Sequence, residues 1–324
     1  MNLELLLKEA LDLYPLTNPA AELIRHNENA TWKVTDGAGK AYVLRIHQPR
    51  EGFSQSLFSQ DKELALRGEL RILAALAAKA DIPVQIPAKN REGNSLTMLS
   101  GGEFATLLTW LHGNTLEEAG ATPELLCEVG RMTALMHQCF QTCPELPEPA
   151  GHDYDKALMD RMTAKFQEME QGNVIAPAFV LGMTACLSEI KRRMAELDQM
   201  NGMFGIVHSD LSKSNMLLCG SRVAPIDFGL WGYGYRYMDL GALACHYTEP
   251  GQQAAIFEGY ESVTRMMVER RYVDPFICLG ILLFICTFGE SVCGEEWFPG
   301  ALERWNNTYF LPLAGGTAPC ATLS

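Results

Sequence analysis

Residues Phe204–Gly241 read FGIVHSDLSKSNMLLCGSRVAPIDFGLWGYGYRYMDLG and are the most informative part of the chain. Two apolar runs within them, Met216–Leu218 and Val223–Ile226, have the length and composition of short β-strands. The residues between these runs, Cys219–Arg222, include Gly and Ser and favour a turn. We therefore expect a β-hairpin at this point.

The register of the hairpin determines which side chains reach its open end. The turn pairs Leu218 with Val223, and counting outward from that pair places Asn215 opposite Ile226. The residue after Ile226 is Asp227. Asn215 and Asp227 are therefore predicted to leave the hairpin side by side.

A third polar side chain belongs to the same place, because Asp210 lies on the loop that leads into the hairpin. Carboxylate and amide oxygens are ligands that Mg²⁺ prefers, especially where it also holds polyphosphate oxygens. With Asn215 and Asp227 as metal ligands, Asp210 is free to orient an attacking hydroxyl and to accept its proton. The group predicts phosphoryl transfer. Its structural alternative is three ordinary turn residues, since Asp and Asn favour turns.

The order of these residues resembles two kinase motifs. His208–Asn215 (HSDLSKSN) resembles the catalytic loop, and Asp227–Gly229 (DFG) resembles the metal-binding motif. Asp239–Gly241 (DLG) follows, without an Ala-Pro-Glu motif to end an activation segment. The combination resembles the aminoglycoside phosphotransferase and choline kinase family, including its homoserine kinase type II-like members, more closely than it resembles protein kinases.

The resemblance implies an α+β, protein-kinase-like fold with two lobes. It implies a small β-rich nucleotide-binding lobe over residues 1–108, a hinge over residues 109–114, and a larger, mostly helical catalytic and acceptor-binding lobe over residues 115–324. The chain's own patterns have the same order, a mostly β first third before a mostly helical remainder. β-prone runs occur at Ala30–Thr35, Ala41–Ile46, Asn94–Leu99 and Phe104–Leu108, and helical spacing at Asp61–Ala78, Pro123–His137 and Ala176–Leu197.

The resemblance also implies residues that bind ATP. Arg45 stands where the family's strand lysine is expected, and its planar guanidinium grips phosphates differently from lysine. Glu69 stands at the start of the partner helix, although Glu63 is a competing partner for Arg45. Asn29 belongs to Asn27–Val34, which resembles the nucleotide-loop hairpin of the family.

The same resemblance implies further contacts to ATP. Thr109 and Leu111 lie in the segment that resembles the hinge, whose backbone receives adenine. Lys213 departs from the family pattern and lies where contacts to the γ-phosphate are expected. His208 is expected to brace the catalytic loop, and Asp239 to accept hydrogen bonds from the backbone of that loop.

The implied activity is transfer of the γ-phosphoryl group of ATP, with Mg²⁺, to a hydroxyl of a small, amine-bearing metabolite or antibiotic. Glu290, Glu295, Glu296 and Trp297 resemble an acidic and aromatic wall for an ammonium group, with a solvated loop as the alternative. Two other functions remain open: a protein Ser/Thr kinase of the bacterial stress-response type, and a nucleotide-binding regulatory module without catalysis. Neither the identity of the acceptor nor the oligomeric state has a signal in the sequence.

Composition narrows the partners and the compartment. The 324 residues include 26 Lys and Arg against 39 Asp and Glu, a net charge of −13 without a basic stripe, so no nucleic-acid partner is expected. The most apolar stretch, Phe276–Phe288, is too short to cross a bilayer, which predicts a buried helix and no membrane. Ten scattered cysteines and a start that resembles an amphipathic helix, not a secretory leader, favour the cytoplasm.

Overall fold

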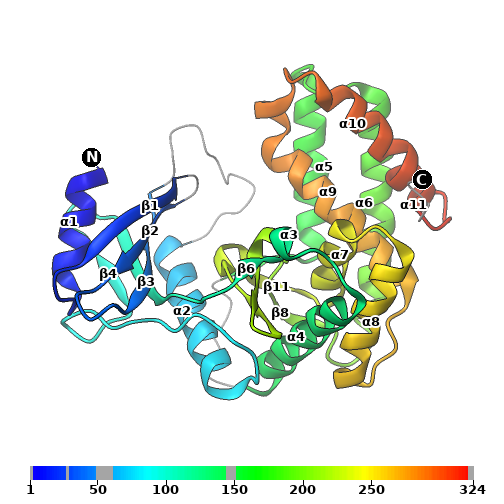
Figure 1. Ribbon diagram of the computed structural model, residues 1–324. Coiled ribbons are helices and arrows are strands. Elements are labelled where there is room, and N and C mark those ends of the chain that lie inside the picture. Colours follow the sequence, from blue (N-terminus) through cyan, green and yellow to red (C-terminus); the bar gives the residue numbers. More distant parts are fainter. Residues whose placement is uncertain (1–2, 27–28, 49–60, 144–150, 320–324) are drawn as a thin grey trace.

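The computed structural model describes residues 3–26, 29–48, 61–143 and 151–319, and Figure 1 shows two lobes. The N-terminal lobe is built on an antiparallel five-stranded sheet with α1 (Leu3–Leu13) and α2 (Lys62–Lys79) beside it. The C-terminal lobe is mostly helical. This arrangement confirms the expected α+β architecture with two lobes.

The sheet of the N-terminal lobe has the strand order β1-β2-β3-β5-β4. The two central hairpin strands match the β-prone runs of the sequence, whereas the first strand has no counterpart among them. Nearly all residues of this first strand are exposed, so neither of its faces needs to be apolar. Its sequence therefore lacks the alternation of apolar and polar residues that marks a half-buried strand. The strands are β1 (Ala20–His26), β2 (Ala30–Thr35), β3 (Ala41–Ile46), β4 (Leu96–Met98) and β5 (Phe104–Thr109).

The turn between β2 and β3 is stabilised by the side chain of one of its residues, Asp36. Asp36 accepts hydrogen bonds at Oδ1 from the backbone N–H groups of Ala38, at 3.0 Å, and Lys40, at 2.9 Å. Gly39 has φ +81°, a conformation that favours glycine. Local chemistry thus fixes this hairpin, which carries Arg45 on its second strand.

The strand β4 is shorter than the sequence indicated. Asn90 accepts hydrogen bonds at Oδ1 from the backbone N–H groups of Glu92 and Asn94, at 3.0 and 2.9 Å. This side chain bends the backbone into a turn, so the strand begins at Leu96 and not at Asn94.

The C-terminal lobe combines two small sheets with a set of helices. The sheets have the orders β10-β9-β6 and β7-β11-β8. Their strands are β6 (Asn114–Thr115), β7 (His152–Asp153), β8 (Phe204–Val207), β9 (Met216–Cys219), β10 (Arg222–Pro225) and β11 (Gly232–Tyr235). The helices are α3 (Leu116–Ala119), α4 (Pro123–Thr142), α5 (Lys156–Gln171), α6 (Pro177–Leu197), α7 (Tyr237–His246), α8 (Pro250–Thr264), α9 (Arg270–Val292), α10 (Trp297–Trp305) and α11 (Leu311–Ala314).

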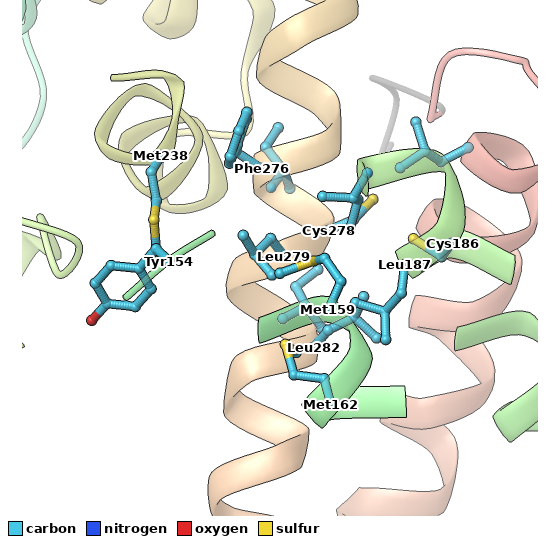
Figure 2. Packing of buried hydrophobic residues seen from close by; sticks show 14 of the residues in the cluster. Tyr154, Met159, Met162, Cys186, Leu187, Met238, Phe276, Cys278, Leu279 and Leu282 are labelled. Atoms are coloured by element: carbon cyan, nitrogen blue, oxygen red, sulfur yellow. The ribbon is translucent and has the colours of Figure 1, made fainter. Parts of the chain in front are cut away.

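Helix α9 forms part of the core of the C-terminal lobe. Its 23 residues make it longer than the apolar run seen in the sequence, and its length and mean hydropathy of 2.0 would suffice to cross a membrane. More than half of that apolar window, 56%, is buried inside the protein. Leu279 and Leu282 belong to one buried cluster with Met159 and Met162 of α5 (Figure 2). These are the contacts of a core helix.

Candidate active site

The hairpin of β9 and β10 has the predicted register. Leu218 pairs with Val223, and the N–H of Ile226 donates to the carbonyl oxygen of Asn215 at 2.9 Å. Asp227 follows with φ +62° and ψ +67°, a left-handed conformation that Asp tolerates better than most side chains. The hairpin therefore brings Asn215 and Asp227 to one open end.

Asn215 also holds the loop that carries Asp210. Its Nδ2 donates to Oδ2 of Asp210 at 2.7 Å and to the carbonyl oxygen of the same residue at 3.0 Å. These bonds use the NH₂ group and leave the amide oxygen of Asn215 as its atom for a cation. Asp210 as a whole residue is half-buried.

Buried Asp239 anchors the same loop from behind. It accepts hydrogen bonds from the backbone N–H groups of His208, at 3.0 Å, and Ser209, at 2.7 Å, and lies 2.8 Å from Nε2 of His137. Burial raises the pKa of Asp239, but the hydrogen bonds from His137 and from the backbone N–H of His208 outweigh burial and hold this pKa below its usual range. The carboxylate stays charged and fixes the loop where Ser209 has φ +66°.

His208 connects the loop to the strand before Asp227. Its Nε2 lies 3.1 Å from the carbonyl oxygen of Ile226, and its Nδ1 accepts from the N–H of Asp210 at 3.3 Å. These partners assign a neutral ring with the proton on Nε2. Burial lowers the pKa of His208, although Asp239 opposes this effect. The imidazole therefore acts as a neutral brace between Asp210 and Asp227.

Arg45 lies between two carboxylates. Its Nη2 is 2.5 Å from Oε1 of Glu69, and its Nη1 is 3.3 Å from Oδ1 of Asp227. Burial lowers the pKa of Arg45, but the two carboxylates outweigh it, so the guanidinium stays charged. The competing candidate, Glu63, instead pairs with Arg67 at 2.7 Å on the exposed side of α2.

Arg25 of β1 is part of the site, although the sequence did not single it out. Its Nη2 lies 2.5 Å from Oδ2 of Asp227. The pairing of β1 with β2 has a register irregularity between Leu23 and Arg25. Ile24 and Arg25 both line the same cavity, which a regular alternating strand does not allow. A bulge of this kind has no signature in the sequence.

A cavity of about 290 Å³ lies between the lobes and reaches these charged groups. Two buried atoms of its lining residues have no hydrogen-bond partner among the residues that the structure describes, Oγ1 of Thr31 and Nε of Arg45. Such atoms are costly unless a ligand satisfies them. The apolar lining of the cavity includes Ile24, Val43, Leu111, Leu217 and Ile226.

The connector between the lobes forms one edge of this cavity. The N–H of Trp110 donates to the carbonyl oxygen of Ala41 at 3.1 Å, whereas the N–H of Leu111 donates to no group in the described parts of the chain. Gly113 lies so close to Leu218 that a Cβ at Gly113 would be 2.4 Å from its carbonyl oxygen. The connector therefore packs directly on the hairpin, and the N–H of Leu111 lies beside the cavity.

Two other residues implied by the resemblance do not line the cavity. Oδ1 of Asn29 lies 2.9 Å from Nδ1 of buried His47, so this amide supports the sheet. Thr109 exchanges hydrogen bonds with the backbone of Ile86 through its own N–H and its Oγ1, each at 2.9 Å. Asn27 and Glu28, in the same predicted nucleotide loop, lie outside the described residues.

Two further expectations concern charged side chains. Nζ of Lys213 lies 4.8 Å from the ring centroid of Tyr247 and does not line the cavity. Oε1 of Glu290 pairs with Nζ of Lys165 at 2.7 Å. One member of the expected acidic wall for an ammonium group, Glu290, is thus already paired with a cation of the chain, Lys165.

The donor set suits a metal ion that is shared with a ligand. Among the described residues, no group of three or more His, Cys, Asp and Glu side chains is arranged to hold a metal ion. Asn215 and Asp227 supply only two hard oxygen ligands, which matches Mg²⁺, since it usually takes few protein ligands and completes its shell with phosphate oxygens and water.

A comparison with protein families assigns most of the chain. Residues 21–273 match the sequence model described as the phosphotransferase enzyme family. A search of curated protein sequences found no significant match.

Solved structures of low sequence identity share the fold. A microcompartment-associated aminopropanol kinase is 21% identical, with a TM-score of 0.78 over 98% of this chain and 100% of that one. An amicoumacin kinase, described as in complex with AMP-PNP, Ca²⁺ and Ami, is 17% identical, with a TM-score of 0.72 over 98% of this chain and 95% of that one. A choline kinase from Cryptosporidium parvum Iowa II is 12% identical, with a TM-score of 0.66 over 98% of each chain. The two-lobed fold of these kinases is therefore the fold of this protein.

Proposed function

The chain belongs to the phosphotransferase enzyme family, and from this premise we propose that it transfers the γ-phosphoryl group of ATP to a hydroxyl group of a small molecule. One observation carries the proposal. Asn215 and Asp227 line a cavity that also contains buried Arg45, while Asp210 is hydrogen-bonded to Asn215 at the mouth of the hairpin. Phosphoryl transfer needs this combination of oxygen ligands, a cation and a proton acceptor.

The nucleotide fits the lining of the cavity. The apolar side chains suit the faces of adenine, and the N–H of Leu111, which donates to no described residue, suits an acceptor nitrogen of the base. Arg45 and the hydroxyl of Thr31, which has no hydrogen-bond partner within the described residues, suit phosphate oxygens. Glu69 holds the guanidinium of Arg45 in place for this contact.

Each polar residue of the site then has one role in the reaction. Asp210 orients the acceptor hydroxyl and takes its proton, and Asp239 fixes the backbone that carries Asp210. Asn215 and Asp227 would hold Mg²⁺, which supplies neutralisation of the charge on the phosphates. Positioning and charge stabilisation account for most of the rate enhancement in this chemistry.

We propose an amino alcohol or a related amine-bearing compound as the acceptor. The kinases with a similar fold include proteins named for aminopropanol and choline, and the net charge of −13 favours cationic ligands. We also propose a cytoplasmic location. The nine cysteines of the described residues are all free thiols, including Cys139 and Cys143 with their Sγ atoms 3.5 Å apart.

The deciding experiment is a screen of ADP release by the purified protein with Mg-ATP. The acceptors are a panel of amino alcohols, amino acids, amino sugars, aminoglycosides and generic protein substrates. Acceptor-dependent ADP release with a small molecule supports the proposal, and phosphate in a protein substrate alone supports a protein kinase. The same low background with every acceptor points to a regulatory module without catalysis.

A further inference from the structure

Both oxygens of the Asp227 carboxylate are bound by arginine side chains. Oδ1 lies 3.3 Å from Nη1 of Arg45, and Oδ2 lies 2.5 Å from Nη2 of Arg25. The proposed function assigns this carboxylate to the metal ion, so a cation of the chain already lies at each of its two oxygens.

The two arginines differ in how firmly they are held. The side chain of Arg45 is only 6% exposed and has a second, short ion pair with Glu69. The side chain of Arg25 is 49% exposed, and Asp227 is its only ion-pair partner within the described residues. Exposed pairs of this kind contribute little free energy, because both charges remain partly hydrated. Arg25 is therefore the replaceable cation and Arg45 the permanent one.

We propose that Arg25 and a divalent metal ion compete for Oδ2 of Asp227. Arg25 neutralises this carboxylate until the metal and nucleotide bind, and its guanidinium must then leave Oδ2. The inference rests on the proposed function, which makes Asp227 a metal ligand.

The geometry makes the two occupants exclusive. Mg²⁺ binds oxygen at about 2.0–2.1 Å, so a guanidinium that stays in short contact with the same oxygen holds its positive charge within a few ångströms of the ion. Two cations that share one oxygen also repel each other strongly in a partly dehydrated cleft. The bulge at Ile24 turns Arg25 toward the cavity, and the half-exposed side chain has room to swing away.

The test is a calorimetric titration of MgCl₂ into the protein saturated with ADP. Removing the competitor in Arg25→Gln is expected to lower the half-saturating Mg²⁺ concentration roughly two- to fivefold, the range that an exposed ion pair allows. Arg25→Lys is expected to lie between this variant and the wild type, because lysine keeps the charge but loses the planar fork. The matched control is Arg192→Gln, which removes another exposed, ion-paired arginine on α6.

A purely structural role for Arg25 makes metal binding weaker or leaves it unchanged. An unchanged or higher Mg²⁺ requirement in Arg25→Gln, with ADP bound as in the wild type, therefore overturns the competition while the proposed function stands. A wild-type protein that binds no Mg-ADP overturns both. Should Arg25→Gln unfold, Arg25→Lys carries the same comparison, and equal half-saturation in Arg25→Lys and the wild type then counts against the competition.

Discussion

Gly68 of α2 lies directly against the indole ring of Trp231, so that a Cβ at Gly68 would be 2.1 Å from Cζ2 of the tryptophan. Nε1 of Trp231 also donates to the carbonyl oxygen of Ala65 on the same helix at 3.0 Å. Glu69 is the neighbour of Gly68, and Asp227 precedes Trp231 by one short turn. This contact therefore ties together the two segments whose carboxylates flank Arg45.

The first prediction follows from that contact. Gly68→Ala forces the helix and the buried Trp231 apart, and overpacking of this kind typically costs about 1–3 kcal/mol. We expect a lower free energy of unfolding and weaker ATP binding, because the shift moves Glu69 away from Arg45. The control is Gly280→Ala in α9, where nothing lies within 4 Å of the added Cβ and helix propensity favours Ala by up to about 1 kcal/mol. Equal stability changes in the two variants would contradict this interpretation.

A second prediction separates two glutamates on the same helix. Glu69→Gln leaves buried Arg45 with a neutral partner and is expected to cost about 1.5–3 kcal/mol of stability, with a loss of ATP affinity. Glu63→Gln breaks only the exposed pair with Arg67, which is worth less than about 1 kcal/mol. Denaturant unfolding and calorimetry with ATP measure both effects. A defect in ATP binding for Glu63→Gln alone would reverse the assignment.

A third prediction concerns the metal. Asp227→Ala removes the carboxylate of the hairpin mouth that lines the cavity. Activity is expected to fall to background, and the affinity for ATP is expected to lose its dependence on Mg²⁺. The measurement is a Mg²⁺ titration of ATP affinity in the variant and the wild type, and an unchanged dependence rules out Asp227 as the principal ligand.

The fourth prediction is a loss of stability in acid. Burial lowers the pKa of His152 from 6.5 to about 4, even though a backbone hydrogen bond with Gly229 opposes the shift. Below pH 6.5 the imidazole of His152 therefore binds a proton in the unfolded chain but stays neutral in the folded chain. Folding becomes less favourable as the pH falls toward 4. The loss approaches about 3 kcal/mol.

His152→Gln is expected to flatten the pH dependence of the unfolding free energy between pH 6.5 and pH 4. The exposed His112, substituted in the same way, serves as the control. Denaturant unfolding at several pH values provides the measurement. Parallel pH profiles for wild type and His152→Gln would show that another group causes the acid sensitivity.

Local patterns of the sequence predicted the hairpin and its mouth well. The Leu218–Val223 pairing depends on a short turn and two apolar runs, so it needs no knowledge of the rest of the chain. The position of Asp239 behind the catalytic loop and the pairing of Arg45 with Glu69 required the family resemblance, because these partners are far apart in the sequence.

Other parts of the site could not be predicted from patterns in the sequence. Arg25 reaches Asp227 through a bulge in an exposed edge strand, where alternation does not report which side chains face the cavity. Gly68 is a lone glycine in a helical pattern, and only the tertiary contact with Trp231 explains it. Lys213 was expected to lie near a phosphate group. In the structure it lies over the ring of Tyr247, and the position of that ring is set by the C-terminal end of α7, which local sequence patterns do not fix.

The last prediction separates chemistry from binding at Asp210. Asp210→Asn keeps an oxygen that can accept the hydrogen bond from Nδ2 of Asn215, so the loop is expected to keep its shape. The variant lacks the charge and basicity that the acceptor hydroxyl needs, and general-base catalysis typically contributes about 10²- to 10⁴-fold, or roughly 3 to 5 kcal/mol. The loss is expected in kcat, with Mg-ATP affinity close to that of the wild type, because only transition-state interactions are removed. Single-turnover transfer to an acceptor from the screen, with calorimetry of nucleotide binding beside it, measures the two quantities. Near-normal turnover, or lost nucleotide binding with normal chemistry at saturation, would falsify the role of Asp210 as the base.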